Sequence, residues 1–272
     1  MPAIYGPGCP TKYEYQGIRP QKGLKRRRAL ATTSQSFTGV ATVGSWHDAA
    51  AFSSAEGQVA SFPGIVGTFA QAVGAKQPDF SHTEWETDGG ACLKFDNVGE
   101  CLTSTDLDLN GGDSYTILAA YKAGGNASHH IILEYNTDWA AANGCALQHA
   151  IGGLALGSTG DGVNYRYGND SADTSNECVV VAITSDRSVA GSGMGQVYVD
   201  GVKVSDFTST SGSDPAGNFG SSTWNMGSRN DGASRPLDGQ IREVVVYPTH
   251  MSEEQIQTLT KCLKWKVRKR SA

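Results

Sequence analysis

The clearest alternation of apolar and polar residues lies between Cys178 and Phe207. Residues 178–188 read CVVVAITSDRS, a β-branched run that ends in polar residues, which is typical of a buried strand. Residues 196–199 and 202–207 alternate in polarity and are joined by Asp200-Gly201. Asp-Gly suits a two-residue turn with positive φ, so this stretch predicts a strand followed by a β-hairpin.

Segments of similar character recur along the chain and predict further short strands. They cover residues 58–62, 92–95, 101–104, 115–121, 131–135, 145–149, 152–156, 164–167, 224–227 and 240–247. Residues 64–90 read as a long irregular loop. One helix is predicted near the C-terminus, where Ser252 and Gln255 form a capping box and Ile256, Leu259 and Leu263 share one face. The pattern therefore indicates an all-β fold with a single short helix.

Length and composition add the domain organisation. The chain has 272 residues with 34 glycines and 18% charged residues, which is compatible with one all-β domain rich in turns. Residues 1–35 contain four prolines and no sustained period, so we expect an extended arm, followed by a single domain over residues 36–272. The sequence has no run of 18 apolar residues, so we expect no membrane-spanning helix. The N-terminus lacks the features of an export signal.

Charge divides the chain into basic ends and an acidic body. Seven basic residues against one glutamate give residues 1–35 a net charge of +6, and six basic residues give residues 261–272 another +6. The remainder must carry −17 to reach the overall −5. We expect the ends to dock on acidic protein neighbours, because the acidic body would oppose nucleic acid. The docking candidates are Lys22, Lys25, Arg26, Arg27, Arg28, Lys264, Lys266, Arg268, Lys269 and Arg270.

Six cysteines are spread thinly, and none forms a C-x-x-C pair, so zinc and redox motifs are absent. We expect mostly buried thiols in a reducing compartment. Residues 91–104 read as strand, turn and strand, and folding about the turn would bring Cys92 opposite Cys101. Whether these two are bonded is left open by the sequence.

The order of these segments resembles the laminin-G-like, concanavalin A-like jelly-roll superfamily, as found in phage and bacterial proteins. The similar segments are WHDA at 46–49, QP at 77–78, LKFDN at 93–97, YTILAAY at 115–121, VVVAIT at 179–184, VYVDGVKV at 197–204 and the strand and helix at 238–266. Asn97 departs from the usual glycine. The resemblance covers about residues 37–267 and implies two antiparallel sheets stacked face to face.

Some relatives in this superfamily cleave glycans with carboxylates at alternating positions of one strand. The nearest string here, Glu84-Trp85-Glu86-Thr87-Asp88, falls in the irregular stretch and reads as solvated loop. Lyase relatives carry Gln-x-His, but Gln148-His149 lacks the intervening residue. We therefore expect no enzymatic activity and assign no catalytic residue.

No cofactor is indicated, and the six histidines lack metal-ligand spacing. Many laminin-G-like domains hold Ca²⁺ through loop aspartates, and Asp106, Asp108, Asp113 and the segment 161–173 could supply donors. Ordinary turn residues are the simpler interpretation, so we assign no metal site.

Glycan binding is the more substantial hypothesis for the surface. Sugars are often met by aromatic faces and fixed polar groups on loops of a rigid scaffold. The candidates are Trp139, Tyr165, Arg166, Tyr167, Trp224 and Asn225. Core or interface packing explains each of them at least as well.

Two hypotheses of different classes follow. The first is an oligomeric structural component of a virion, made in the host cytoplasm, that decorates a capsid or joins a tail and docks through its basic ends on other structural proteins, such as the major capsid or tail protein. The second is a carbohydrate-binding adhesin for host-surface glycans, supported by analogy of fold. A glycan-cleaving enzyme ranks third.

Overall fold

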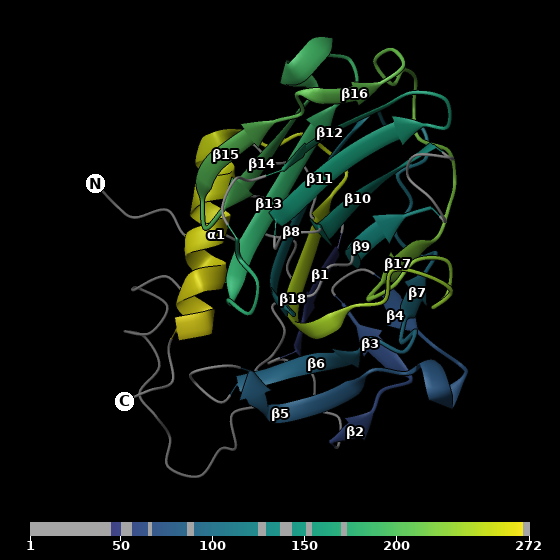
Figure 1. The fold of residues 1–272 in the computed structure, drawn as a ribbon, viewed down its shortest axis with the longest axis vertical. Coiled ribbons are helices and arrows are strands. Elements are labelled where there is room, and N and C mark those ends of the chain that lie inside the picture. Colours follow the sequence, from purple (N-terminus) through teal and green to yellow (C-terminus); the bar gives the residue numbers. More distant parts are fainter. Residues whose placement is uncertain are drawn as a thin grey trace, which may run out of the picture.

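The computed structural model describes residues 45–49, 56–64, 67–85, 90–124, 129–136, 143–150, 154–169 and 173–268. Within these residues the chain forms two antiparallel sheets stacked face to face, and one helix covers part of one outer face (Figure 1). The all-β jelly-roll sandwich predicted from the sequence is confirmed. The predicted arm at residues 1–35 lies outside the described residues, so the domain boundary stays a prediction.

Sheet A has nine strands in the described part of the chain. In spatial order they are β15 (Val202–Asp206), β14 (Gly195–Val199), β13 (Val179–Asp186), β8 (Ser114–Ala123), β18 (Asp238–Tyr247), β6 (Gly90–Asp96), β5 (Asp79–Trp85) and β2 (Gly57–Gln58), with β1 (Ser45–Asp48) also paired to β18. The β14–β15 turn has positive φ at both residues, 56° at Asp200 and 84° at Gly201, so the predicted hairpin is confirmed.

Sheet B also has nine described strands. Their spatial order is β16 (Ser209–Ser211), β12 (Tyr165–Asn169), β11 (Leu154–Asp161), β10 (Asn143–Ala150), β9 (His130–Tyr135), β17 (Trp224–Met226), β7 (Leu102–Ser104), β4 (Thr68–Ala70) and β3 (Ser61–Pro63). Two short 3₁₀ turns, η2 (Gly74–Lys76) and η4 (Gly191–Met194), lie in the connections.

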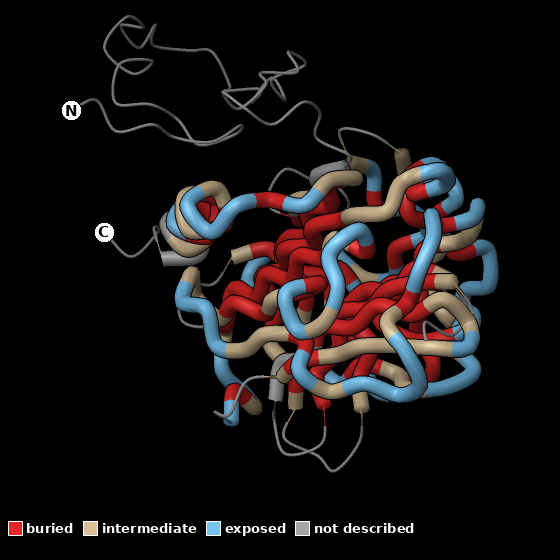
Figure 2. Tube along the Cα trace, turned by 90° about the horizontal axis from the view of Figure 1, so that it is seen from above, coloured by how far each residue is buried: buried red, intermediate tan, exposed pale blue. Residues whose placement is uncertain are grey.

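The main core fills the space between the sheets. Alternate residues of facing strands are fully buried there, including Ile117 and Ile183 of sheet A and Leu147 of sheet B. Viewed from above, the buried segments form the interior and the exposed segments surround them (Figure 2). Each such side chain contributes roughly 2 kcal/mol through loss of its apolar surface from water.

A second core lies on the other side of sheet A, beneath α1 (Glu253–Arg268). Ile256, Leu259 and Leu263 are fully buried against residues of β8, β13 and β18, as the sequence pattern predicts. The capping box is also confirmed, because the Ser252 amide donates to Gln255 Oε1 at 2.9 Å and the Gln255 amide donates back to Ser252 Oγ at 3.4 Å. Among the described residues, no helix has the length and hydropathy needed to cross a lipid bilayer.

Two sequence predictions are wrong. Cys92 lies on β6 in sheet A, whereas Cys101 precedes β7 in sheet B, so the turn between them crosses from one sheet to the other. Both thiols are buried and unbonded.

The stretch 64–90 is not one irregular loop, because β4 and β5 lie within it. β5 reads DFSHTEW, and its mixed polarity hides the strand because the register with β6 is interrupted between Ser81 and Trp85.

Candidate functional site

A row of mainly small and polar side chains crosses the outer face of sheet B. Residues in direct register form it, one from each of eight neighbouring strands: Ser209, Tyr167, Ser158, Ala146, Glu134, Asn225, Thr103 and Ala70. Their neighbours along the strands, such as Cys145, Leu147 and Trp224, belong to the core. Because side chains alternate across a strand, the row must face away from the core.

A pocket of about 560 Å³ opens at the β7 end of this row. Its lining comes from β4, β7, β17 and the connections around them: Ala70, Gln71, Ala72, Thr103, Thr223, Asn225, Asn230 and Asp231. The volume lies within the range of small-molecule sites. The lining offers hydroxyl, amide and carboxylate groups, the set that hydrogen-bonds to neutral polar ligands.

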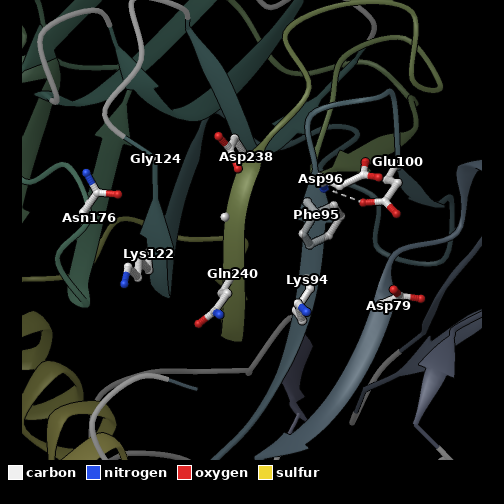
Figure 3. Close-up of a pocket in the computed structure, with 11 residues that line it drawn as sticks. Asp79, Lys94, Phe95, Asp96, Glu100, Lys122, Gly124, Asn176, Asp238 and Gln240 are labelled. Carbon is white, nitrogen blue, oxygen red and sulfur yellow. Dashed lines mark hydrogen bonds between the residues drawn. The ribbon is translucent and has the colours of Figure 1, made fainter. Parts of the chain in front are cut away.

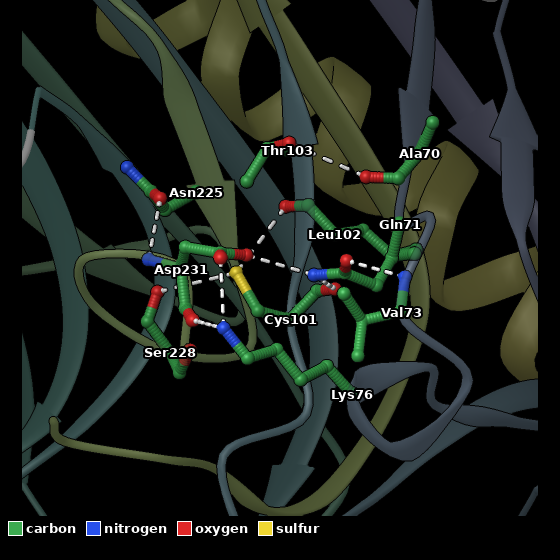
Figure 4. A network of polar contacts seen from close by, with 10 residues as sticks. All are labelled: Ala70, Gln71, Val73, Lys76, Cys101, Leu102, Thr103, Asn225, Ser228 and Asp231. Atoms are coloured by element: carbon green, nitrogen blue, oxygen red, sulfur yellow. Dashed lines mark hydrogen bonds and ion pairs between the residues drawn. The ribbon is translucent and has the colours of Figure 1, made fainter. Parts of the chain in front are cut away.

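The wall of the pocket is held by a network around Asp231 (Figure 4). Lys76 Nζ donates to Asp231 Oδ2 at 2.8 Å, and Gln71 Nε2 donates to Oδ1 at 2.8 Å. The Asp231 amide donates to Asn225 Oδ1 at 3.4 Å. The hydrogen bond from Lys76 holds the pKa of Asp231 below its usual value, so the carboxylate stays charged at neutral pH.

The chain reaches this position through a tight turn. Asn230 and Asp231 both have positive φ, 54° and 52°, and Gly232 follows at 88°. Asn and Asp accept this left-handed region better than most residues. The turn projects the exposed side chain of Asn230 at the pocket rim, where its amide can meet a ligand.

The opposite end of the same face carries two tyrosines. Tyr165 and Tyr167 alternate on β12, so both rings lie on the outer face; their centroids are 6.1 Å apart and their planes are inclined by 30°. They stand in register with Ser211 and Ser209 of the edge strand β16. Both tyrosines are half-buried, so part of each ring remains accessible for stacking.

The other predicted glycan-binding residues have different positions. Asn225 lines the pocket, although its side chain is only 3% exposed and its amide donates to the Asn136 and Thr223 carbonyls. Arg166 points to the opposite face of β12, where it pairs with Asp214 and donates to the Phe207 carbonyl. Trp139 lies outside the described residues.

Trp224 is a correction. Its indole is fully buried in the main core, beside the Tyr135 ring, and Nε1 donates to the Leu107 carbonyl at 2.8 Å. It therefore stabilises the sandwich and has no surface to offer a sugar. The sequence places an aromatic residue next to Asn225 but does not tell which of the two faces inward.

The aspartates considered for Ca²⁺ accept hydrogen bonds from the protein itself. Asp108 accepts from the Tyr135 hydroxyl and from Ser221 Oγ, while Asp161 accepts from the amides of Val163, Asn164 and Ala216. Within the described ranges, no group of three or more His, Cys, Asp or Glu residues could hold a metal ion. These contacts are those of turn-forming residues.

The described residues that were considered for catalysis do not lie together in one site. Glu84 is the penultimate residue of β5 and forms an ion pair with Lys94, whereas Glu86, Thr87 and Asp88 lie outside the described residues. Gln148 accepts a hydrogen bond from Arg235 on the outer face of β10. His149 points inward, edge-on to the Tyr121 ring.

The basic docking candidates are described in part. Lys264 forms an ion pair with Asp200 of the β14–β15 turn, 2.5 Å between Nζ and Oδ2, so it joins α1 to sheet A within the same chain. Lys266 and Arg268 lie on α1, but their side chains are not among those described. Lys22, Lys25, Arg26, Arg27, Arg28, Lys269 and Arg270 lie outside the described residues.

Most residues of the pocket carry no local sequence signal for binding. Gln71, Thr103, Asn230 and Asp231 come from segments up to 160 residues apart, and the strand pairing brings them together. The one local signal was the run Asn230-Asp231-Gly232, which indicates a tight turn but not its neighbours.

Comparison with known proteins yields one family match. The family profile described as the concanavalin A-like lectin/glucanases superfamily matches residues 96–257. No curated protein matches the chain.

Solved structures with similar folds share little sequence with this chain. The NanB sialidase of Streptococcus pneumoniae (K499G mutant) is 17% identical, with a TM-score of 0.48 over 61% of this chain and 27% of the sialidase. The CBM40 of a Ruminococcus gnavus sialidase, bound to α2,3-sialyllactose, is 15% identical, with a TM-score of 0.44 over 55% and 83% of the two chains. Domain 4 of the arabinanase AbnA from Geobacillus stearothermophilus, in complex with arabinotriose, is 14% identical, with a TM-score of 0.47 over 67% and 81%. The match spans about a quarter of the length of the sialidase.

Proposed function

This chain belongs to the concanavalin A-like lectin/glucanase superfamily, and on that premise we propose that it is a carbohydrate-binding protein whose site is the outer face of sheet B. The observation that carries the proposal is the pocket beside Thr103, Asn225 and Asn230, which combines fixed polar groups with a volume suited to one or two sugar units. A network of hydrogen bonds holds its wall in place before any ligand arrives, which lowers the entropic cost of binding.

The aromatic end of the face adds a second kind of contact. Tyr165 and Tyr167 offer partly exposed rings on the same face of sheet B. Ser158, Ala146 and Glu134 lie between these rings and the pocket and are fully buried, so the rings would contact a separate part of a longer glycan. A sugar presents apolar C–H groups on one side and hydroxyls around its rim, so ring faces and hydrogen-bonding groups on one surface complement it.

Binding is favoured over hydrolysis by the acidic groups available. Glycoside hydrolysis ordinarily uses two carboxylic acids flanking the bond, whereas Asp231 is the single carboxylate among the described residues that line the pocket. Its oxygens already accept hydrogen bonds from Gln71 and Lys76.

The virion assembly hypothesis remains a prediction. It rests on the charge difference between the ends and the body of the chain, and most of the residues that it names lie outside the described ranges. The family match bears on the glycan hypothesis instead.

A glycan array probed with the full-length chain tests the proposal. We expect saturable binding to a restricted set of glycans, competed by the same free sugar. An array that stays dark, at protein concentrations that detect millimolar affinities, would overturn the proposal.

A further inference from the structure

The charge of the pocket on sheet B limits the class of sugar that it can hold. Among the described residues that line this pocket, Asp231 is the one charged group, and the others supply hydroxyl, amide and methyl groups. The Asp231 side chain is 54% exposed, so its carboxylate is accessible to a ligand. From these lining residues a ligand therefore meets a negative charge and no positive one.

The Asp231 carboxylate keeps acceptor capacity after its contacts within the protein. Oδ1 accepts one hydrogen bond from Gln71 and Oδ2 accepts one from Lys76 (Figure 4). An ionised carboxylate has about four acceptor sites, so roughly half of them remain. Sugar hydroxyls are donors that can fill these sites, and a hydrogen bond to a charged acceptor is stronger than one between neutral groups.

Two basic side chains flank the pocket wall, and both are committed to partners within the protein. Lys76 Nζ donates to Asp231 Oδ2 at 2.8 Å and to the Asp231 carbonyl oxygen at 2.7 Å. Arg229 is buried, and its Nε and Nη2 both donate to Glu134. A guanidinium holds a carboxylate best through two parallel N–H groups, and those of Arg229 are already occupied. Neither side chain therefore offers the pocket a free cationic site for an acidic sugar.

The rest of the molecule does not compensate for this lack. Residues 36–260 carry a net charge of −17, and a field of this sign lowers the local concentration of anionic ligands. A second pocket, of about 320 Å³ on sheet A, is lined by Lys94 and Lys122 but also by four carboxylates (Figure 3). Lys94 also pairs with Glu84 and stands in register with Asp79. Neither pocket thus presents a surplus of positive charge.

We propose that the pocket on sheet B selects uncharged sugars against sugars that carry a carboxylate, such as uronic and sialic acids, and that Asp231 sets this selectivity. Asp231 accepts hydrogen bonds from sugar hydroxyls and repels a second carboxylate in the same place. This inference rests on the proposed function, because it names the class of sugar that the same site takes.

Isothermal titration of the full-length chain with a matched pair of sugars tests the inference. The probes are a neutral hexose oligosaccharide selected on the array and the same oligosaccharide with its terminal hexose oxidised at C6 to the uronic acid. We expect the neutral sugar to bind at least tenfold more tightly at low salt. The difference should narrow in 1 M sodium chloride, where the Debye length falls to about 3 Å. A difference due to shape alone would not respond to salt.

The Asp231→Asn variant separates a charge effect from a structural one. Asparagine keeps the size of the side chain and an acceptor oxygen for Gln71, and it tolerates the φ of 52° at this position. We expect a severalfold loss of affinity for the neutral sugar and at least a threefold fall in the ratio of neutral to uronic affinity. If Asp231 only held the pocket wall, both affinities would fall together. An unchanged ratio would therefore overturn the role assigned to Asp231.

Asp206→Asn is the matched control. Asp206 forms a similarly exposed ion pair with Lys203, but on sheet A and outside the pocket, so this variant should keep the wild-type ratio. Tighter binding of the uronic sugar by the wild-type chain would overturn the inference and leave the proposed carbohydrate function standing. Absence of binding to any sugar would overturn both.

Discussion

Arg229 and Glu134 form a buried two-point ion pair on sheet B. Arg229 Nη2 donates to Glu134 Oε1 at 2.7 Å, and Nε donates to Oε2 at 3.0 Å. The Glu134 side chain is fully buried and that of Arg229 is 10% exposed. The pair anchors the turn that carries Asn230 and Asp231 to the adjacent strand β9, so it positions the rim of the proposed glycan site.

Removing one partner of this pair should destabilise the protein strongly. Glu134→Gln leaves the buried Arg229 without its countercharge, at a cost of about 3–5 kcal/mol in the free energy of unfolding. The exposed pair between Lys203 and Asp206 offers the control, because Lys203→Gln should cost less than about 1 kcal/mol. Urea unfolding of both variants measures the difference. Equal losses would contradict the role assigned to burial.

Acid should destabilise the fold through two buried histidines. Burial lowers the pKa of His47 to about 4 and that of His149 to about 4, against an ordinary value of 6.5. The unfolded chain therefore binds more protons between these values, so the stabilisation is complete above pH 6.5 and is lost as the pH falls towards 4. Burial raises the pKa of Glu100, so protonation of this one carboxylate stabilises the folded state as the pH falls. It offsets only part of the destabilisation caused by the two histidines.

Urea unfolding at a series of pH values measures this dependence. The His149→Phe variant should show a shallower loss of stability on acidification than the wild type. His82→Phe, at an exposed position of β5, is the matched control and should keep the wild-type slope. A slope unchanged by His149→Phe would show that this imidazole does not titrate as described.

Replacing Gly227 should destabilise the fold for two reasons, its positive φ and the lack of space for a side chain. Its φ is 84°, and a Cβ at this position would overlap the Phe95 ring. Gly227→Ala combines backbone strain of about 1 kcal/mol with overpacking of about 1–3 kcal/mol. Gly217, with a φ of 75° and open space around it, isolates the first effect. Thermal melts should show a clearly larger loss for Gly227→Ala, and equal losses would contradict the packing argument.

Local sequence signals predicted what depends on neighbours along the chain. Asp200-Gly201 predicted a turn with positive φ, and Ser252 with Gln255 predicted a helix start; both are confirmed. The same reasoning failed between Cys92 and Cys101, because a short strand–turn–strand pattern does not tell whether the second strand returns to the same sheet.

The candidate site was harder to predict because it depends on pairing between distant segments. Tyr165 and Tyr167 were predicted as aromatic candidates, and it is the strand β12 that places both rings on one face. Trp224 has the same kind of signal but faces the core, where its ring packs against Tyr135. Asp231 carries no binding signal of its own and acquires its position from Gln71 and Lys76.

The most direct measurement for the central claim is the dissociation constant of an array-selected glycan for the wild-type chain and for Thr103→Phe. Thr103 is half-buried in the pocket on sheet B, so a phenyl ring there fills space that the sugar would need. We predict at least a tenfold loss of affinity with unchanged thermal stability, whereas Lys203→Gln on sheet A binds like the wild type. Wild-type affinity in Thr103→Phe would contradict the account.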